Sequence, residues 1–217
     1  MMGSMATRSD ELSEALGGQR LFVEVPDALA DWIPACEVVV QERLAAFALG
    51  AARLEDLPTA LAFFGRRARV GVHGASTPQQ VADAFGAGAH FVTSPVCTPD
   101  LLDAAGGRPL VVGALTPTEV AIAAGQGAMA VQIIPADVMS TAYSRALLPL
   151  CPDVPIVATG RLERFQAEMW LDAGAAAVGL VETAVKAETS QGIFPDVQDL
   201  DEARRRCQAY ADLAMLN

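Results

Sequence analysis

An amide side chain stands inside an apolar segment of this chain. Residues 130–137 read Ala-Val-Gln-Ile-Ile-Pro-Ala-Asp, with Gln132 near the middle, and a short apolar run that ends at proline is typical of a buried parallel strand. A buried amide without hydrogen-bond partners costs about 1–3 kcal/mol, so we expect Gln132 to bond to Thr159 or to a bound oxo-anion. Two interpretations stay open: Gln132 binds a ligand carbonyl or carboxylate, or it only satisfies neighbouring groups.

A histidine and a cysteine are the other candidates for chemistry. His73 ends one apolar run, where an imidazole can act as a general acid or base or serve as a structural hydrogen-bonding group. Cys97 follows the next run, and a thiol nucleophile needs a partnered base, for which His73 is the candidate. An inert, buried thiol is the alternative for Cys97. His90, which begins a run, is expected to be structural.

Apolar runs and helical patterns alternate along the chain from about residue 20. Eight runs, each followed by a helical stretch, predict a (β/α)8 TIM barrel of the α/β class; they span residues 21–25, 45–49, 69–72, 90–93, 110–113, 130–134, 155–158 and 176–180. Residues at the carboxyl ends of these strands would gather at one mouth of the barrel.

Thr-Pro pairs follow three consecutive runs and predict helix starts, with threonine as N-cap and proline in the first turn; they are Thr77-Pro78, Thr98-Pro99 and Thr116-Pro117. The first two units are less regular, because Pro34 lies within the poor helical pattern of residues 26–41. Residues 200–213 predict a final amphipathic helix.

Composition narrows the class of protein. The chain has 217 residues and a formal net charge of −11, which argues against nucleic acid or an anionic membrane surface as a partner. Four cysteines without metal-ligand spacing predict neither a metal site nor disulfides, and no cofactor motif is present. We expect a cytoplasmic protein with residues 6–217 in a single barrel domain. Residues 1–5 resemble a remnant of an expression vector.

Several segments resemble the 2-keto-3-deoxy-6-phosphogluconate / 4-hydroxy-2-oxoglutarate aldolase family. The matching residues, in order, are Thr77-Pro78-Gln79-Gln80, Gly86-Ala87-Gly88-Ala89-His90-Phe91, Ser94-Pro95, Gly113 with Thr116, residues 131–137, and Thr159-Gly160. The resemblance implies a class I aldolase barrel that assembles as a homotrimer. It also implies a lysine that forms a Schiff base with the substrate.

Three functional positions of that family differ in this chain. Gln132 stands where the family motif Lys-Phe-Phe-Pro-Ala places the lysine, and the chain's one lysine is Lys186. Because an amide lone pair is delocalised, Gln132 cannot form an imine. Residues 45–50, on the second strand, hold no counterpart of the family's catalytic glutamate. The glycine pairs that bind phosphate become Gly160-Arg161 and Leu180-Val181.

Other positions keep the family's pocket. The resemblance assigns Thr116, Thr159, Gly113, Gly160 and Pro95 to the substrate pocket. Gln132 and Arg161 differ from the family and are added as substrate-binding candidates, with Arg161 as a ligand for phosphate or carboxylate. Glu182 and Lys186 are spaced for an ion pair on a helix. Asp137 is expected to cap a helix.

The three departures favour a divergent aldolase-family barrel that lacks Schiff-base activity and binds a small oxo-acid or another anionic metabolite. One alternative is an active lyase or isomerase that acts on a 2-oxo acid through His73 or another group that is not a lysine. Another alternative is a non-catalytic scaffold that binds a protein partner.

Overall fold

The computed structural model describes residues 7–29, 31–152, 154–181 and 200–215. Its eight strands form a closed barrel in the order of the sequence, and every neighbouring pair is parallel. The strands are β1 (Leu21–Glu24), β2 (Ala46–Gly50), β3 (Arg69–His73), β4 (Val92–Thr93), β5 (Leu110–Ala114), β6 (Ala130–Ile133), β7 (Ile156–Gly160) and β8 (Ala177–Val181). The predicted TIM barrel is confirmed, and β1 and β2 close it.

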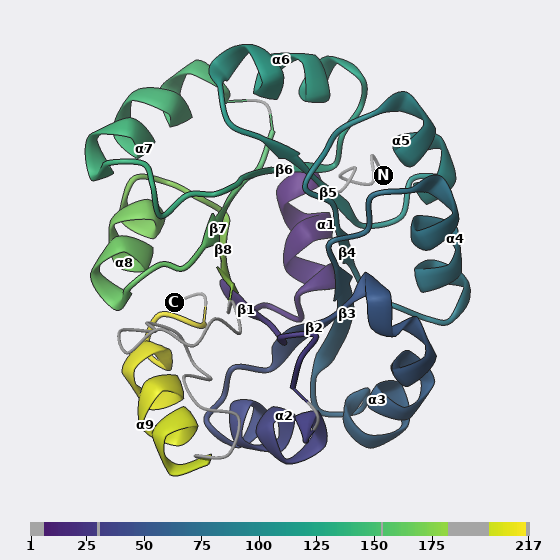
Figure 1. The fold of residues 1–217 in the computed structure, drawn as a ribbon. Helices are drawn as coiled ribbons and strands as arrows, with labels where there is room; N and C mark the ends of the chain where they lie inside the picture. Colours follow the sequence, from purple (N-terminus) through teal and green to yellow (C-terminus); the bar gives the residue numbers. More distant parts are fainter. Residues whose placement is uncertain (1–6, 30, 153, 182–199, 216–217) are drawn as a thin grey trace, which may run out of the picture.

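Most of the helices surround the barrel on the outside (Figure 1). The helices of the described residues are α1 (Arg8–Ala15), α2 (Trp32–Gln41), α3 (Leu57–Phe64), α4 (Pro78–Gly86), α5 (Pro99–Ala105), α6 (Pro117–Gly125), α7 (Thr141–Leu147), α8 (Arg164–Asp172) and α9 (Leu200–Tyr210), with 3-10 turns η1 (Ala51–Asp56) and η2 (Leu148–Leu150). Thr77, Thr98 and Thr116 are the N-caps of α4, α5 and α6, as predicted.

Helix α2 starts later than the sequence pattern suggested. It begins at Trp32, so Pro34 lies in its first turn, where a backbone N–H has no partner within the helix and proline is tolerated. The final helix ends at Tyr210 rather than at residue 213. Among the described residues, the structure contains no helix with the length and apolarity that crossing a membrane requires.

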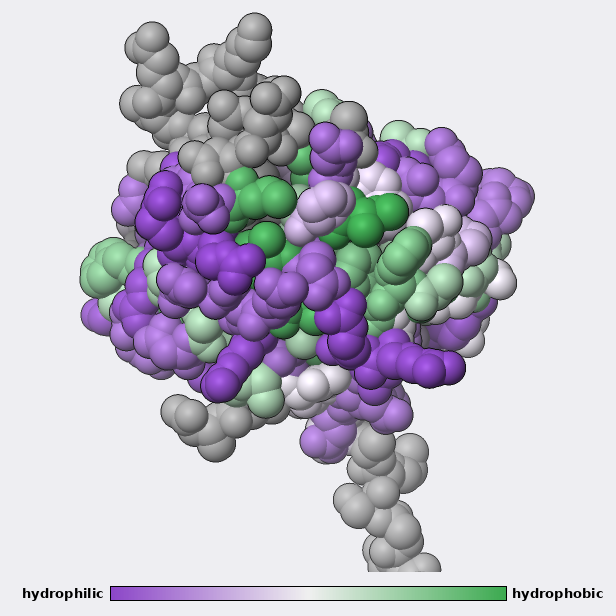
Figure 2. Space-filling view, turned by 90° about the horizontal axis from the view of Figure 1, so that it is seen from below, coloured by the Kyte–Doolittle hydropathy of each residue, from purple (hydrophilic) through white to green (hydrophobic). Residues whose placement is uncertain are grey.

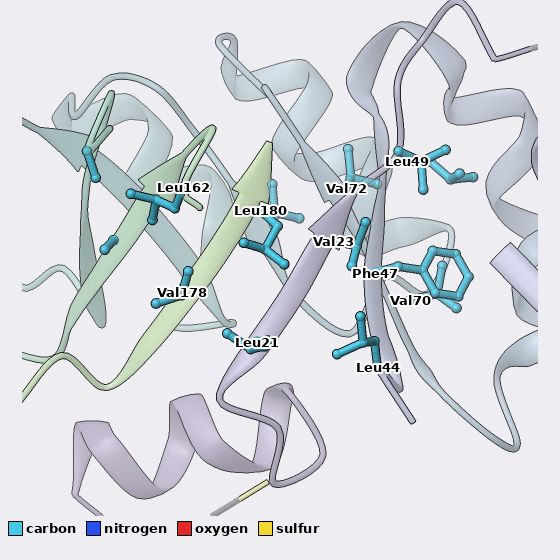
Figure 3. Packing of buried hydrophobic residues seen from close by; sticks show 14 of the residues in the cluster. Leu21, Val23, Leu44, Phe47, Leu49, Val70, Val72, Leu162, Val178 and Leu180 are labelled. Carbon is cyan, nitrogen blue, oxygen red and sulfur yellow. The ribbon is translucent and has the colours of Figure 1, made fainter. Parts of the chain in front are cut away.

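The outer surface of the strands forms the main core with the helices. Figure 3 shows Leu21 and Val23 of β1, Phe47 and Leu49 of β2 and Val178 of β8 within this cluster of buried side chains. On the side of the molecule seen in Figure 2, hydrophilic side chains cover most of the surface around a smaller hydrophobic patch. The strand residues are buried on both faces, in one cluster with the helices and in another inside the barrel, as parallel strands in a barrel require.

The inside of the barrel is filled at its amino-terminal end. Helix α1 lies across this end (Figure 1), and its Leu12 packs in one cluster with Phe22 and Phe91 from the interior. The two rings meet edge to face, with centroids 5.3 Å apart. A Cβ at Gly71 would lie 2.6 Å from the Phe91 ring, so this glycine makes room for the aromatic pair.

Candidate functional site

Polar side chains occupy the inward positions two residues beyond the aromatic layer. Because alternate residues of a strand face the same side, Glu24 lies above Phe22 on β1 and Thr93 lies above Phe91 on β4. His73, Gln132 and Thr159 hold the equivalent inward positions on β3, β6 and β7. These five side chains form a polar layer at the carboxyl end of the barrel, where barrel enzymes carry their chemistry.

Gln132 is 1 % exposed, and only one end of its amide has a partner. Its Nε2 donates to the carbonyl of Ser94 at 2.7 Å, while Oε1 has no hydrogen-bond partner. The predicted bond between Gln132 and Thr159 is wrong, because the Thr159 hydroxyl also lacks a partner. The structure therefore leaves two buried polar atoms without hydrogen-bond partners on the neighbouring strands β6 and β7.

Gly113 explains how Gln132 reaches the loop after β4. Gly113 pairs in register with Gln132, and a Cβ there would lie 2.1 Å from the carbonyl oxygen of Pro95. Any side chain at this position would push the Ser94-Pro95 backbone away from the barrel interior. The absence of a side chain at Gly113 therefore allows the Ser94-Pro95 backbone to approach β5 closely enough for Gln132 to reach the Ser94 carbonyl.

The end of β7 brings Thr159, Gly160 and Arg161 together. Thr159 is fully buried, and a Cβ at Gly160 would lie 2.3 Å from Oδ1 of Asp137. Asp137 Oδ1 accepts from the backbone N–H of Arg161 at 3.2 Å. The expectation that Asp137 caps a helix is wrong, because the N-cap of α7 is Ser140. The Arg161 side chain is exposed at the mouth of the barrel.

Glu24 and His73 form a second polar group on the opposite part of the same layer. Oε2 of Glu24 lies 3.4 Å from Nδ1 of His73, and Oε1 of Glu24 accepts from the Thr93 hydroxyl at 3.4 Å. The His73 Nε2 is 3.0 Å from the carbonyl oxygen of Val25. Since β1 and β4 are not neighbours, the contact between Glu24 and Thr93 crosses the inside of the barrel.

Burial changes the acidity of Glu24. The side chain is almost fully buried, and loss of hydration raises the pKa of its carboxyl group. The nearby His73 and the Thr93 hydroxyl lower this pKa, and Asp27 raises it further, so that burial determines the direction of the net shift. Glu24 therefore holds a proton more tightly than an ordinary glutamate does.

Glu24 was missed by the sequence interpretation. Residues 45–50 on the second strand were expected to leave the pocket without a carboxylate, and that stretch indeed holds none. Glu24, however, pairs in register with Ala48 of β2, so a carboxyl group lies at the same height on the adjacent strand. The signal was present in the sequence, because Glu24 interrupts an apolar run just as Gln132 does.

Cys97 and Thr116 have partners outside this polar layer. The Cys97 thiol lies 3.6 Å from Oε1 of Gln126, in a surface groove that Ile122 also lines, and burial raises the pKa of this thiol. The structure does not pair Cys97 with His73, the base that a nucleophilic thiol would need, since both His73 nitrogens face other partners. The Thr116 hydroxyl belongs to the exposed capping box of α6 with Glu119 rather than to the barrel interior.

Of the remaining single-residue predictions, that for His90 can be compared with the structure, and those for Glu182 and Lys186 cannot. His90 is structural, as expected, because its Nδ1 accepts from the backbone N–H of Val70 at 3.0 Å. Glu182 and Lys186 lie outside the described residues, as do residues 1–5. Within the part of the chain that the structure describes, no group of three or more His, Cys, Asp or Glu side chains could hold a metal ion.

The closed barrel of parallel strands and surrounding helices is the (β/α)8 fold of the aldolase type. The sequence profile described as KDPG and KHG aldolase matches residues 65–198, which is more than half of the chain. The chain therefore belongs to the KDPG and KHG aldolase family.

Solved structures of low sequence identity share this fold. The 2-keto-3-deoxy-6-phosphogluconate aldolase of Zymomonas mobilis is 18% identical, with a TM-score of 0.78 over 94% of this chain and 98% of its own. The KDPG aldolase of Legionella pneumophila, solved with pyruvate as a covalent carbinolamine, is 20% identical, with a TM-score of 0.74 over 94% and 98%.

The same barrel also supports other chemistry. The thiamine phosphate pyrophosphorylase of Pyrococcus furiosus is 17% identical, with a TM-score of 0.63 over 88% of this chain and 96% of its own. No curated protein sequence matches the chain. Function must therefore be argued from the site itself.

Proposed function

We propose that the barrel binds a small 2-oxo acid or a related anionic metabolite against Gln132 and Thr159, and that it does so without forming a Schiff base. The family and the fold support an aldolase-like function. The observation that carries the proposal is the pair of buried atoms without partners, Gln132 Oε1 and Thr159 Oγ1. Buried polar groups in native proteins nearly always have hydrogen-bond partners.

The two atoms favour a ligand with both an acceptor and a donor. The Thr159 hydroxyl can donate to the carbonyl or carboxylate oxygen of an oxo acid, whereas Gln132 Oε1 can only accept. A hydroxyl group, as in a hydroxy-oxo acid or in the enol form of an oxo acid, would supply the missing donor. This pairing predicts that a hydroxyl-bearing oxo acid binds more tightly than a simple carboxylate.

The mouth of the barrel favours negative charge. Helices α4, α6 and α8 begin beyond the carboxyl ends of β3, β5 and β7, so the positive ends of their dipoles face this mouth. The exposed Arg161 side chain follows β7 and adds a formal positive charge that could pair with a carboxylate or phosphate.

The absence of imine chemistry rests on the residue at position 132. The family resemblance places the reactive lysine there, and an amide cannot replace an amine as the nucleophile. Incubation with pyruvate and sodium borohydride, followed by intact mass measurement, should leave the mass of the protein unchanged. A Gln132→Lys variant that gains an adduct would be the matched positive control, and an adduct at Lys186 in the natural chain would contradict the proposal.

Ligand binding is tested by thermal unfolding and ligand-observed NMR with 2-oxobutyrate, 4-hydroxy-2-oxoglutarate and butyrate. The two oxo acids should raise the melting temperature, and butyrate, which lacks the oxo group, should not. If no oxo acid binds and a specific protein co-purifies with the barrel, the alternative of an interaction scaffold gains support.

Assembly and location are also proposed from the family resemblance. We expect a homotrimer in the cytoplasm, and sedimentation equilibrium of the purified protein would measure the number of subunits.

A further inference from the structure

The contacts of the Glu24 and His73 pair favour a shared proton. A backbone carbonyl can only accept a hydrogen bond, so the His73 Nε2 that faces the Val25 carbonyl at 3.0 Å carries a hydrogen. The other ring nitrogen, Nδ1, then faces Oε2 of Glu24 at 3.4 Å. Two bare lone pairs would repel one another at this distance, whereas one further proton on either atom makes the contact attractive.

That proton has two possible positions. The pair is either a neutral imidazole with a carboxylic acid or an imidazolium with a carboxylate, and both forms have the same net charge. Burial of Glu24 favours the first form, and the attraction of His73 favours the second. The groups that face Glu24 are His73 from β3, Thr93 from β4 and Asp27 from the loop after β1.

The pair is connected to the proposed ligand site through two consecutive residues. The Thr93 side chain donates to Glu24, and the carbonyl of the next residue, Ser94, accepts from Gln132. Both contacts reach into the barrel interior above the aromatic layer. A ligand held against Gln132 and Thr159 would therefore lie in the same inward-facing layer of the barrel as the carboxyl group of Glu24.

We propose that Glu24 exchanges a proton with C3 of a 2-oxo acid bound in this polar layer, with His73 as its charge partner. The proposal rests on the proposed function, because it needs the ligand to be bound. In the forward step the C3–H bond breaks and the proton passes to the Glu24 carboxylate. The bonding pair forms a C2=C3 double bond, and the π electrons of the C2 carbonyl move onto its oxygen.

The products of this step balance in charge. The ligand becomes an enolate whose oxygen accepts from the Thr159 hydroxyl, while the carboxylate and imidazolium become a carboxylic acid beside an imidazolium. The Glu24 and His73 pair therefore gains one positive charge as the ligand gains one negative charge, and the total charge is unchanged. Return of the proton, or of a deuteron acquired from D2O, regenerates the oxo acid without a further reactant. Glu24 is the catalytic residue, and His73 is a positioning residue that acts through Glu24.

Deuterium uptake at C3 of 2-oxobutyrate in D2O, followed by proton NMR, tests this proposal. The two C3 hydrogens are stereochemically distinct on a protein surface, so the natural chain should exchange one of them faster than the other and faster than buffer alone. Because general acid–base catalysis contributes about 10²–10⁴-fold, Glu24→Gln should slow the exchange at least about 100-fold. Thermal unfolding of this variant verifies that it is folded.

Control variants test whether the exchange depends on Glu24 and His73 specifically rather than on any carboxyl or imidazole group. Glu37→Gln removes a carboxyl on α2 that pairs with Arg67, and His90→Gln removes the chain's other histidine; both should keep the exchange. His73→Gln should slow the exchange and also change its pH profile, whereas a purely structural role would lower it equally at every pH.

The outcomes distinguish this proposal from the proposed function. Binding of 2-oxobutyrate with exchange no faster than in buffer would overturn the role of Glu24 and leave the binding site intact. Exchange that persists in Glu24→Gln would overturn it as well. Failure of 2-oxobutyrate and 4-hydroxy-2-oxoglutarate to bind would reject the binding proposal itself, and with it this inference.

Discussion

The aromatic layer and the polar layer inside the barrel lie only two residues apart on the same strands, yet they have opposite chemistry. Phe22 and Phe91 fill the lower positions and pack edge to face above α1. Glu24 and Thr93, the next inward residues on β1 and β4, hydrogen-bond to one another instead. The apolar side chains of the lower layer are packed against one another and against α1. The upper layer, by contrast, has two buried polar atoms without hydrogen-bond partners.

This difference separates the source of stability from the source of function. Packing of large apolar side chains stabilises a fold in proportion to the area that they bury. A buried polar atom without a partner opposes folding by about 1–3 kcal/mol. Substitutions in the lower layer should therefore act on stability, and substitutions in the upper layer should act on ligand binding and proton transfer.

The largest expected effect is in the aromatic layer. Phe91→Ala should lower the free energy of unfolding by about 3–5 kcal/mol, because the cavity left inside a closed barrel cannot collapse. Phe63→Ala is the matched control, since Phe63 is 58% exposed and its loss should cost little. Urea unfolding measures both. Similar losses in the two variants would mean that the aromatic layer is not a principal source of stability.

A second prediction concerns the pH dependence of stability in the polar layer. The folded-state pKa of Glu24 is raised above that of the unfolded chain, so bound protons stabilise the fold. This contribution is fully present below the ordinary glutamate pKa, about 4.3, and is lost as pH rises through the raised pKa. Relative to Glu24→Gln, the natural chain should therefore lose stability as pH increases.

Glu37 provides a control with the opposite sign. The hydrogen bond from Arg67 lowers the pKa of Glu37, so its contribution is present above the ordinary glutamate pKa and is lost as pH falls through the lowered one. Urea unfolding at a series of pH values should give opposite slopes for the differences between the natural chain and the two Gln variants. Equal slopes would contradict the assignment of Glu24 as a buried acid.

The fold was predictable because its signals are local. Each Thr-Pro pair specifies a helix start through the conformation of adjacent residues, and Thr77, Thr98 and Thr116 all became N-caps. Apolar runs specify strands in the same local way, and eight of them define the barrel. Helix α1 was not predicted. Its buried residues pack against the open end of the barrel interior, and that surface exists only once the barrel has closed.

The site was predictable only in part because its contacts are not local. The burial of Gln132 followed from its apolar neighbours, but its partner is a backbone carbonyl, that of Ser94, and such a partner has no signature in a sequence. Glu24 depends on His73 and Thr93, which reach it across the barrel. Strand register, which the sequence does not reveal, decides that Glu24 lies level with Ala48.

Two threonines that the family resemblance assigned to the same pocket give the smallest and sharpest contrast. Thr116 is exposed, and its hydroxyl caps α6 through Glu119, so Thr116→Val should cost about 1 kcal/mol of stability and leave ligand binding unchanged. Thr159 is buried without a partner, and valine has nearly the same shape. Thr159→Val should therefore keep the free energy of unfolding or raise it by about 1 kcal/mol.

For ligand affinity, Thr159→Val should have the larger effect and Thr116→Val should have none. Loss of the hydrogen bond from the Thr159 hydroxyl is expected to weaken binding of 2-oxobutyrate about tenfold, the equivalent of roughly 1.4 kcal/mol. Calorimetric titration of both variants, together with urea unfolding, measures the two quantities on the same proteins. If Thr159 is purely structural, Thr159→Val should lower the free energy of unfolding and leave the affinity for 2-oxobutyrate unchanged. If its hydroxyl binds the ligand, Thr159→Val should keep or raise the free energy of unfolding and weaken the affinity. Only the second result assigns the unpartnered hydroxyl to a ligand.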